Sequence, residues 1–183
     1  MKYEAVRGPR FVVDQDGGGE IIRIPARRSV PFLLFISIWL AGWTAGGLSV
    51  IGEFRASHDL FLGFWLCAWA AGVGFASLMI VWMLAGSETL RVIQGDLENS
   101  WRIGPVTWRK LYEGARVQTL KPAPQHPFFS SFRVSAPFGI YSQFGAVQFD
   151  YGARTIRLAP GLDEAEARLI VERLRKGLPK AAA

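Results

Sequence analysis

The chain has few of the residues that build reactive sites: among its 183 residues are one cysteine, Cys67, and two histidines, His58 and His126. A single cysteine excludes an intrachain disulfide and any multi-cysteine zinc or iron–sulfur site. The sequence contains no glycine-rich phosphate loop, Walker-type sequence or G-x-S-x-G elbow. Cys67 lies inside an apolar stretch, where a low dielectric disfavours a reactive thiolate, so we expect it to be a packing residue. These deficits predict a protein that is not an enzyme and holds no metal or cofactor.

Charge is missing from two long stretches of the chain. Neither Ser29–Gly52 nor Leu60–Ser87 contains an Asp, Glu, Lys or Arg, and half of all residues are hydrophobic. A helix needs about 20 apolar residues to cross the hydrocarbon core of a bilayer, and both stretches exceed that length. They predict two transmembrane helices, where the alternative is a pair of buried core helices. The short connection, residues 53–59, makes them antiparallel neighbours, so residues 29–87 are expected to form a transmembrane helical hairpin.

The basic residues predict how this hairpin is oriented. Of the 21 Lys and Arg residues, six precede the first stretch, 14 follow the second, and only Arg55 lies between them. Because cytoplasmic segments carry the excess of Lys and Arg, both termini should face the cytoplasm. The net charge of +6 is then explained by topology, and no nucleic-acid partner is expected. His58 and His126 would lie on opposite sides of the bilayer and could not share a metal.

The two apolar stretches contain an internal repeat. FISIWLAGWTAG (Phe35–Gly46) and FLGFWLCAWAAG (Phe61–Gly72) align residue by residue at one constant offset. Trp residues four apart share a helix face, and small residues at the same spacing allow helices to approach closely in lipid. These rows of Trp and small residues either pack the two helices of the hairpin against each other or bind a helix of a partner protein. The candidate residues for helix packing or partner docking are Trp39, Gly42, Trp43, Gly46, Trp65, Ala68, Trp69 and Gly72.

The sequence patterns outside the two apolar stretches predict a β-sheet and one helix. Residues 1–28 contain a β-hairpin signal, two apolar segments (residues 11–13 and 20–24) around a turn-rich insert. An isolated hairpin is marginally stable, so this one should pair with the sheet predicted within residues 88–179. The expected strands of that sheet are 88–94, 98–103, 106–112, 116–120, 132–136, 146–151 and 155–159. A helix capped by Asp163 and Glu166 follows, with an apolar stripe at Ala167, Ile170, Val171, Leu174 and Leu178, and residues 180–183 form a tail.

Two features of the chain carry a resemblance to a known group. The stretch VQFDYGARTIRLAPGLDEAEARLIVERLRKGL (Val147–Leu178), with its strands and closing helix, resembles the pleckstrin-homology-like fold. Together with the WLAGW and WLCAW motifs, it is similar to small bacterial membrane proteins that carry such a domain after two spans. The resemblance implies an α+β domain of about seven antiparallel strands and a C-terminal helix that binds proteins or organises complexes, and it brings no catalytic motif. Relatives that bind phosphoinositides use a basic first hairpin loop, whereas residues 94–99 here are acidic, so that activity is not transferred.

A third candidate surface is rich in aromatic residues. The segment contains Phe128, Phe129 and Phe138 beside Pro, Gly and Ser residues. Either neighbouring aromatic residues of this segment fill the domain core, or the three Phe side chains insert into the membrane interface. Arg27 and Arg28 directly precede the first span. Each would strengthen binding to an anionic lipid surface by about 1 kcal/mol. These five residues are the predicted membrane-interface site.

These observations favour a non-catalytic accessory, assembly or scaffolding subunit of a larger membrane complex, with integral membrane proteins and the lipid bilayer as partners. The resemblance implies that this membrane is a bacterial inner membrane. The alternative is a membrane-anchored pleckstrin-homology-like domain that senses a lipid or a small ligand. A homo-oligomeric pore is disfavoured because the spans contain no charged residues.

Overall fold

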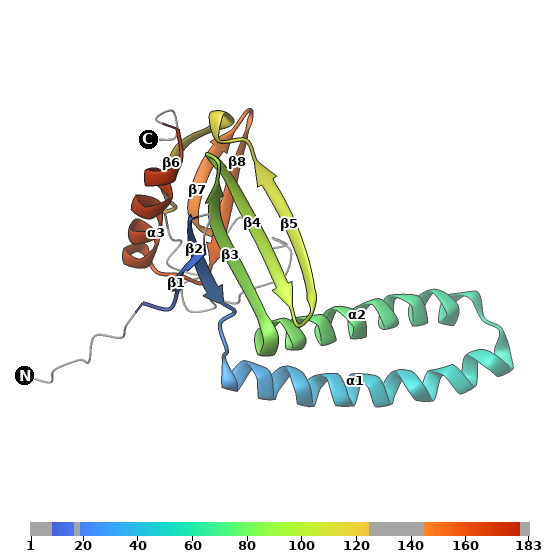
Figure 1. Cartoon of the computed structure of the whole chain (residues 1–183). Coiled ribbons are helices and arrows are strands. Elements are labelled where there is room, and N and C mark those ends of the chain that lie inside the picture. Colours follow the sequence, from blue (N-terminus) through green and yellow to red (C-terminus); the bar gives the residue numbers. More distant parts are fainter. Residues whose placement is uncertain (1–8, 17–18, 125–144, 180–183) are drawn as a thin grey trace, which may run out of the picture. The chain divides into compact units, whose positions relative to one another are not determined.

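The chain folds into two compact units. The computed structural model describes residues 9–16, 19–124 and 145–179, which Figure 1 colours in sequence order. Residues 28–84 form the helical unit, whereas the described residues within 1–27 and 85–183 form the sheet unit. The sheet unit is therefore built from both ends of the chain, and the helical unit from its middle.

The helical unit is an antiparallel pair of long helices, α1 (Val30–Ser57) and α2 (Leu60–Ala85). Both are long and apolar enough to cross a membrane, and only 6% and 11% of their most apolar stretches are buried. A core helix would be mostly buried, so this exposure argues against core helices packed among the described residues. The connection is shorter than the predicted loop 53–59, because α1 continues to Ser57 and ends at His58 with a left-handed φ of 51°. Ser29 directly precedes α1 as its N-cap residue, and its side chain makes no capping hydrogen bond.

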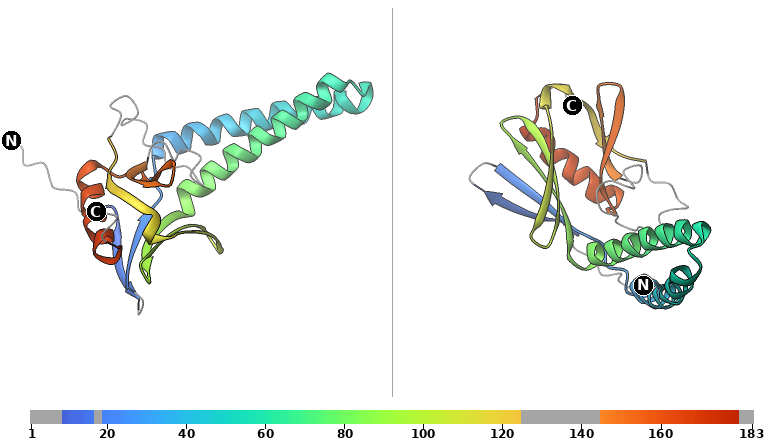
Figure 2. Two further views of the ribbon diagram at one scale, coloured as in Figure 1. Left: turned by 90° about the horizontal axis from the view of Figure 1, so that it is seen from above. Right: turned by 90° about the vertical axis from the view of Figure 1, so that its right-hand side faces the viewer.

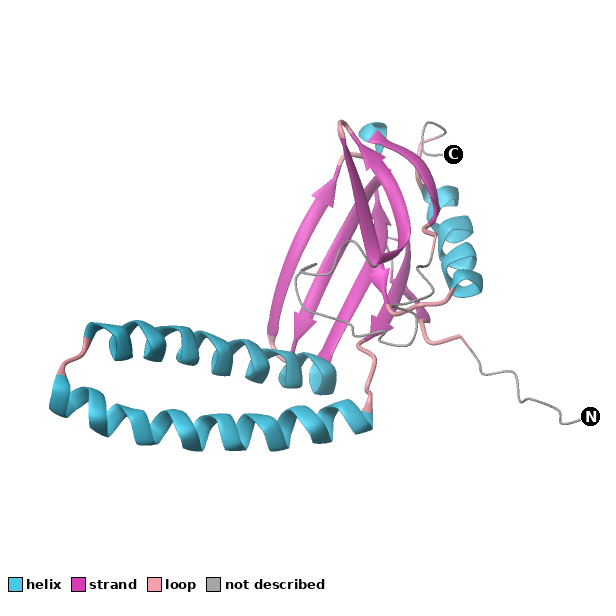
Figure 3. Ribbon diagram, turned by 180° about the vertical axis from the view of Figure 1, so that it is seen from behind, coloured by secondary structure: helices cyan, strands magenta, loops and turns pink. Residues whose placement is uncertain are grey.

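The first sheet has five antiparallel strands in the order β1-β2-β3-β4-β5 (Figures 1 and 3). The strands are β1 (Val12–Asp16), β2 (Gly19–Pro25), β3 (Gly86–Ile93), β4 (Asp96–Ile103) and β5 (Val106–Tyr112). β2 pairs with β3, so that Ile22 lies opposite Leu90. This pairing confirms that the N-terminal hairpin joins the sheet that follows the helices.

The second sheet has three antiparallel strands, β6 (Val117–Pro122), β7 (Gly145–Tyr151) and β8 (Arg154–Pro160). A short 3-10 turn, η1 (Gly114–Arg116), leads into β6 and moves the predicted start of this strand to Val117. The other predicted strands that fall on described residues are confirmed with slightly different ends. The predicted strand 132–136 lies outside the described residues.

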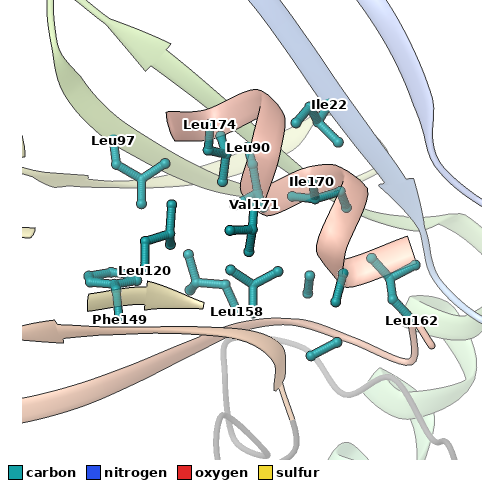
Figure 4. Packing of buried hydrophobic residues seen from close by; sticks show 14 of the residues in the cluster. Ile22, Leu90, Leu97, Leu120, Phe149, Leu158, Leu162, Ile170, Val171 and Leu174 are labelled. Carbon is teal, nitrogen blue, oxygen red and sulfur yellow. The ribbon is translucent and has the colours of Figure 1, made fainter. Parts of the chain in front are cut away.

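The helix α3 (Glu164–Gly177) packs against β3 of one sheet and against β6 and β7 of the other (Figure 2). Its predicted capping box is confirmed: the Glu166 backbone N–H donates to Asp163 Oδ1 at 2.8 Å, and the Asp163 N–H donates to Glu166 Oε2 at 2.9 Å. The predicted apolar stripe of α3 is buried. Figure 4 shows its side chains meeting residues of both sheets in one core, which includes Ile22, Leu90, Leu97, Leu120, Phe149, Leu158, Leu162, Ile170, Val171 and Leu174.

Candidate functional site

A cluster of tryptophans holds the two helices of the helical unit together. Trp39 and Trp43 stack with ring centroids 5.1 Å apart, and Trp43 lies 6.3 Å from Trp65 of the other helix. The Trp69 indole N–H donates a hydrogen bond of 2.9 Å to the backbone carbonyl of Trp43. An indole N–H in an apolar environment needs such a partner, so this bond fixes the rotation of one helix against the other. The repeated tryptophans therefore contact each other across the pair.

The close approach of the helices occurs at Gly47, a glycine outside the predicted site. Gly47 is the buried residue of α1, and a Cβ placed there would lie 1.9 Å from Trp69 Cε2. Only glycine leaves room for the indole ring at this point. The sequence offers one signal for it, because Gly47 follows Trp43 by four residues and so shares its face.

The predicted packing residues separate into two groups. Gly42 and Gly46 are exposed, and a Cβ at either position would meet nothing within 4 Å. Ala68 is also exposed, whereas a Cβ on Gly72 would make an ordinary contact of 3.9 Å with Trp43 Nε1. The residues that the structure brings together are Trp39, Trp43, Trp65, Trp69 and Gly72. Gly42 and Gly46, which we name the glycine face of α1, are not packed against α2 or any other described element.

The predicted membrane-interface residues are described only in part. The Arg28 guanidinium donates a hydrogen bond of 2.9 Å to the Leu84 carbonyl in the last turn of α2. A cation there satisfies a terminal carbonyl and opposes the negative end of the helix dipole. Arg27 is half-buried. Phe128, Phe129 and Phe138 lie outside the described residues, so the aromatic surface stays a prediction.

Sequence reasoning missed a polar cluster inside the sheet unit. Glu88 of β3 and Asn99 of β4 are buried among the apolar residues between the two sheets, with 3% and 0% of their surfaces exposed. The Asn99 side chain lies near enough to lower the pKa of Glu88, yet neither of its polar atoms makes a hydrogen bond of normal geometry to a described residue. The alternation of buried and exposed residues in β3, which puts Glu88 on the face of Leu90, could have revealed it.

This cluster titrates near neutral pH. Burial raises the pKa of Glu88 to about 7, although a hydrogen bond from the backbone of Ala159 and the Asn99 side chain oppose that rise. Burial also raises the pKa of Tyr112 to about 12, and the nearby charge of Glu88 adds to this effect. Glu88 therefore changes its charge inside the core over the pH range in which cells live.

Similarity to known proteins does not assign a role to these residues. Among the described residues, no three His, Cys, Asp or Glu side chains come together as a group that could hold a metal ion. No protein-family model matches the chain, and neither a curated protein nor a solved structure shows significant similarity to it. What the protein does must therefore be inferred from its own residues.

Proposed function

We propose that this protein is a non-catalytic accessory, assembly or scaffolding subunit of a larger complex in a bacterial inner membrane. α1 and α2 anchor it, and both termini face the cytoplasm. The sheet unit acts as a pleckstrin-homology-like domain that binds partner proteins. Two helices of suitable length and apolarity, joined to an antiparallel β domain with a C-terminal helix, support this proposal.

The observation that carries the proposal is the glycine face of α1. In lipid, apolar side chains gain little by leaving the acyl chains, so helices associate where small residues let their backbones approach. The tryptophans and Gly47 already serve the contact between α1 and α2. Gly42 and Gly46 stand one turn apart, exposed, with open space beyond them. This geometry suits the helix of another integral membrane protein.

Purification from native membranes in a mild detergent tests the proposal. We expect the tagged wild-type chain to co-purify with at least one integral membrane protein and Gly46→Ile to lose that partner. Gly52→Ile is the matched control, because Gly52 is also exposed with nothing within 4 Å of its Cβ but projects from a different side of α1. A wild-type chain that runs only as a monomer without a membrane partner would overturn the scaffold function.

The buried cluster favours a second candidate, a sheet unit that senses a small ligand. A buried Asn side chain that makes no hydrogen bond of normal geometry to the described residues costs roughly 1–3 kcal/mol, a cost that a polar ligand reaching Asn99 would offset. Native mass spectrometry of the protein purified from its own membrane tests this. We expect a bound small molecule that Asn99→Leu loses and Gln148→Leu keeps, since Gln148 also has a buried side-chain oxygen without a partner among described residues. Wild-type protein without added mass would exclude this candidate.

A further inference from the structure

One end of the five-stranded sheet is tied directly to the apolar helices. Gly86, the first residue of β3, follows the last residue of α2 without an intervening residue, and β2 ends at Pro25, shortly before α1 begins. Strand register continues this end across the sheet, since Gly86 pairs with Ile103 of β4, which pairs with Val106 of β5. Each residue of extended chain spans at most about 3.3–3.6 Å, so these short connections keep this end of the sheet close to the helix ends. If α1 and α2 span a bilayer, the end of the sheet that is joined to them lies nearest to that bilayer. The turn between β4 and β5 belongs to this end.

This turn carries an apolar and aromatic surface. Ile103 pairs with Val106 and Trp101 pairs with Trp108, so all four side chains lie on one face of the β4–β5 hairpin. Val106 is 49% exposed and Trp108 42% exposed, while Trp101 and Ile103 are half-buried. Gly104, with a φ of +55°, and Pro105 form the turn in the Gly-X order of a type II′ hairpin. The apolar turn is thus presented on a stiff support, with two Trp residues of the kind that settle at membrane interfaces.

Charge along the hairpin differs between its two ends. Arg102, paired with Thr107, and Arg109, paired with Ser100, are exposed on the opposite face of the hairpin, in the half nearer the turn. At the far end of the hairpin, Asp96 at the start of β4 accepts the Gly114 N–H at 2.8 Å, and Glu113 after β5 is paired with Arg116 at 3.9 Å. The two arginines near the turn would therefore favour anionic phosphates at this end of the hairpin.

We propose that Trp101, Ile103, Val106 and Trp108, flanked by Arg102 and Arg109, form a lipid-binding surface. The β4–β5 turn inserts into the interface of an anionic bilayer, and the two arginines contact headgroup phosphates. This surface would hold the sheet unit against the membrane in addition to its covalent tethers. It rests on α1 and α2 spanning the bilayer, as in the proposed function, but it requires no protein partner.

Nitroxide labels on the full chain test this surface. In a Cys67→Ala background, Val106→Cys reports on the turn. Leu111→Cys is the matched control, since it is 58% exposed on the same edge strand, about 17 Å farther along. Leu48→Cys, at an exposed site of α1, reports on the span. The chain is reconstituted into vesicles of phosphatidylcholine, with or without phosphatidylglycerol, and collisions with oxygen and with a water-soluble nickel complex are measured.

We expect the ratio of oxygen to nickel collisions to be several-fold higher at Val106 than at Leu111 in vesicles containing phosphatidylglycerol. That ratio should fall without the anionic lipid, or when Arg102→Glu and Arg109→Glu are combined. Three results would overturn the lipid-binding surface. The Val106 label would be as accessible to nickel as the Leu111 label, or it would be shielded from both reagents, or its collision ratio would not depend on the anionic lipid. A water-accessible Leu48 label would instead overturn the spans and the proposed function with them.

Discussion

At the scale of single residues, Glu88 shows how burial makes an ordinary carboxyl group titrate near neutral pH. Its pKa is about 7 in the folded chain, against a value of 4.5 for an exposed glutamate. Strand alternation in the sequence places Glu88 on the face of Leu90, but the Ala159 backbone that contacts it comes from β8, far along the chain. That partner follows from how the two sheets face each other, which no local pattern encodes.

The stability of the sheet unit should therefore decrease as the pH rises. A raised carboxyl pKa means that the folded state holds its proton more tightly than the unfolded state. The associated stability is fully present below about pH 4.5 and lost as the pH passes 7, a change of roughly 3 kcal/mol in the free energy of unfolding. Glu88→Gln cannot ionise, so its stability relative to wild type should improve by about that amount between pH 4 and pH 8. Chemical denaturation in detergent at a series of pH values measures this difference, and a constant difference would contradict the prediction.

At the scale of elements, the positions of the helices could be predicted from the sequence, whereas the contacts between α1 and α2 could not. Charge-free stretches predicted α1 and α2, and the Asp163–Glu166 pair predicted the start of α3. Gly47 escaped prediction because which of several glycines meets a neighbour depends on the rotation of both helices. That rotation is fixed by the Trp69–Trp43 hydrogen bond, between residues of different helices.

Gly47→Ala should weaken the helix pair, whereas Gly46→Ala should not. The added methyl group at position 47 would overlap the Trp69 ring, and overpacking of this kind costs typically about 1–3 kcal/mol. At position 46 the methyl group meets open space. Near-ultraviolet circular dichroism during thermal unfolding in detergent, which reports on the stacked indoles, measures the difference. Equal midpoints for the two variants would show that the ring moves aside freely.

At the scale of the whole molecule, the sheet unit joins segments separated by both helices. A hairpin too small to be stable alone predicted that residues 11–24 would seek another sheet, and β2 pairs with β3 as expected. The division of the strands into sheets of five and three could not be foreseen, because hydrophobic alternation marks strands without identifying their neighbours. The β-bulge between Gln118 and Lys121 likewise has no clear signal in the sequence.

Ile22→Ala tests whether the N-terminal hairpin is an integral part of the sheet unit. Ile22 is 1% exposed and belongs to the same core as Leu90 and Ile170. Emptying this site should lower the free energy of unfolding by about 2–5 kcal/mol. Ile21→Ala, on the opposite, half-buried face of β2, should cost clearly less. Denaturant titration of both variants gives the comparison, and equal small losses would mean that the hairpin is dispensable.

The pairing of β2 with β3 also constrains how the molecule is made. β2 leaves the ribosome first, but its partner strand emerges only after both apolar helices have been synthesised. At about 5–20 residues per second, β2 waits several seconds, with its hydrogen-bonding edge open to other chains. If the helices are inserted in lipid, the sheet can close only when the second has crossed back, so completing the sheet would report that insertion has finished.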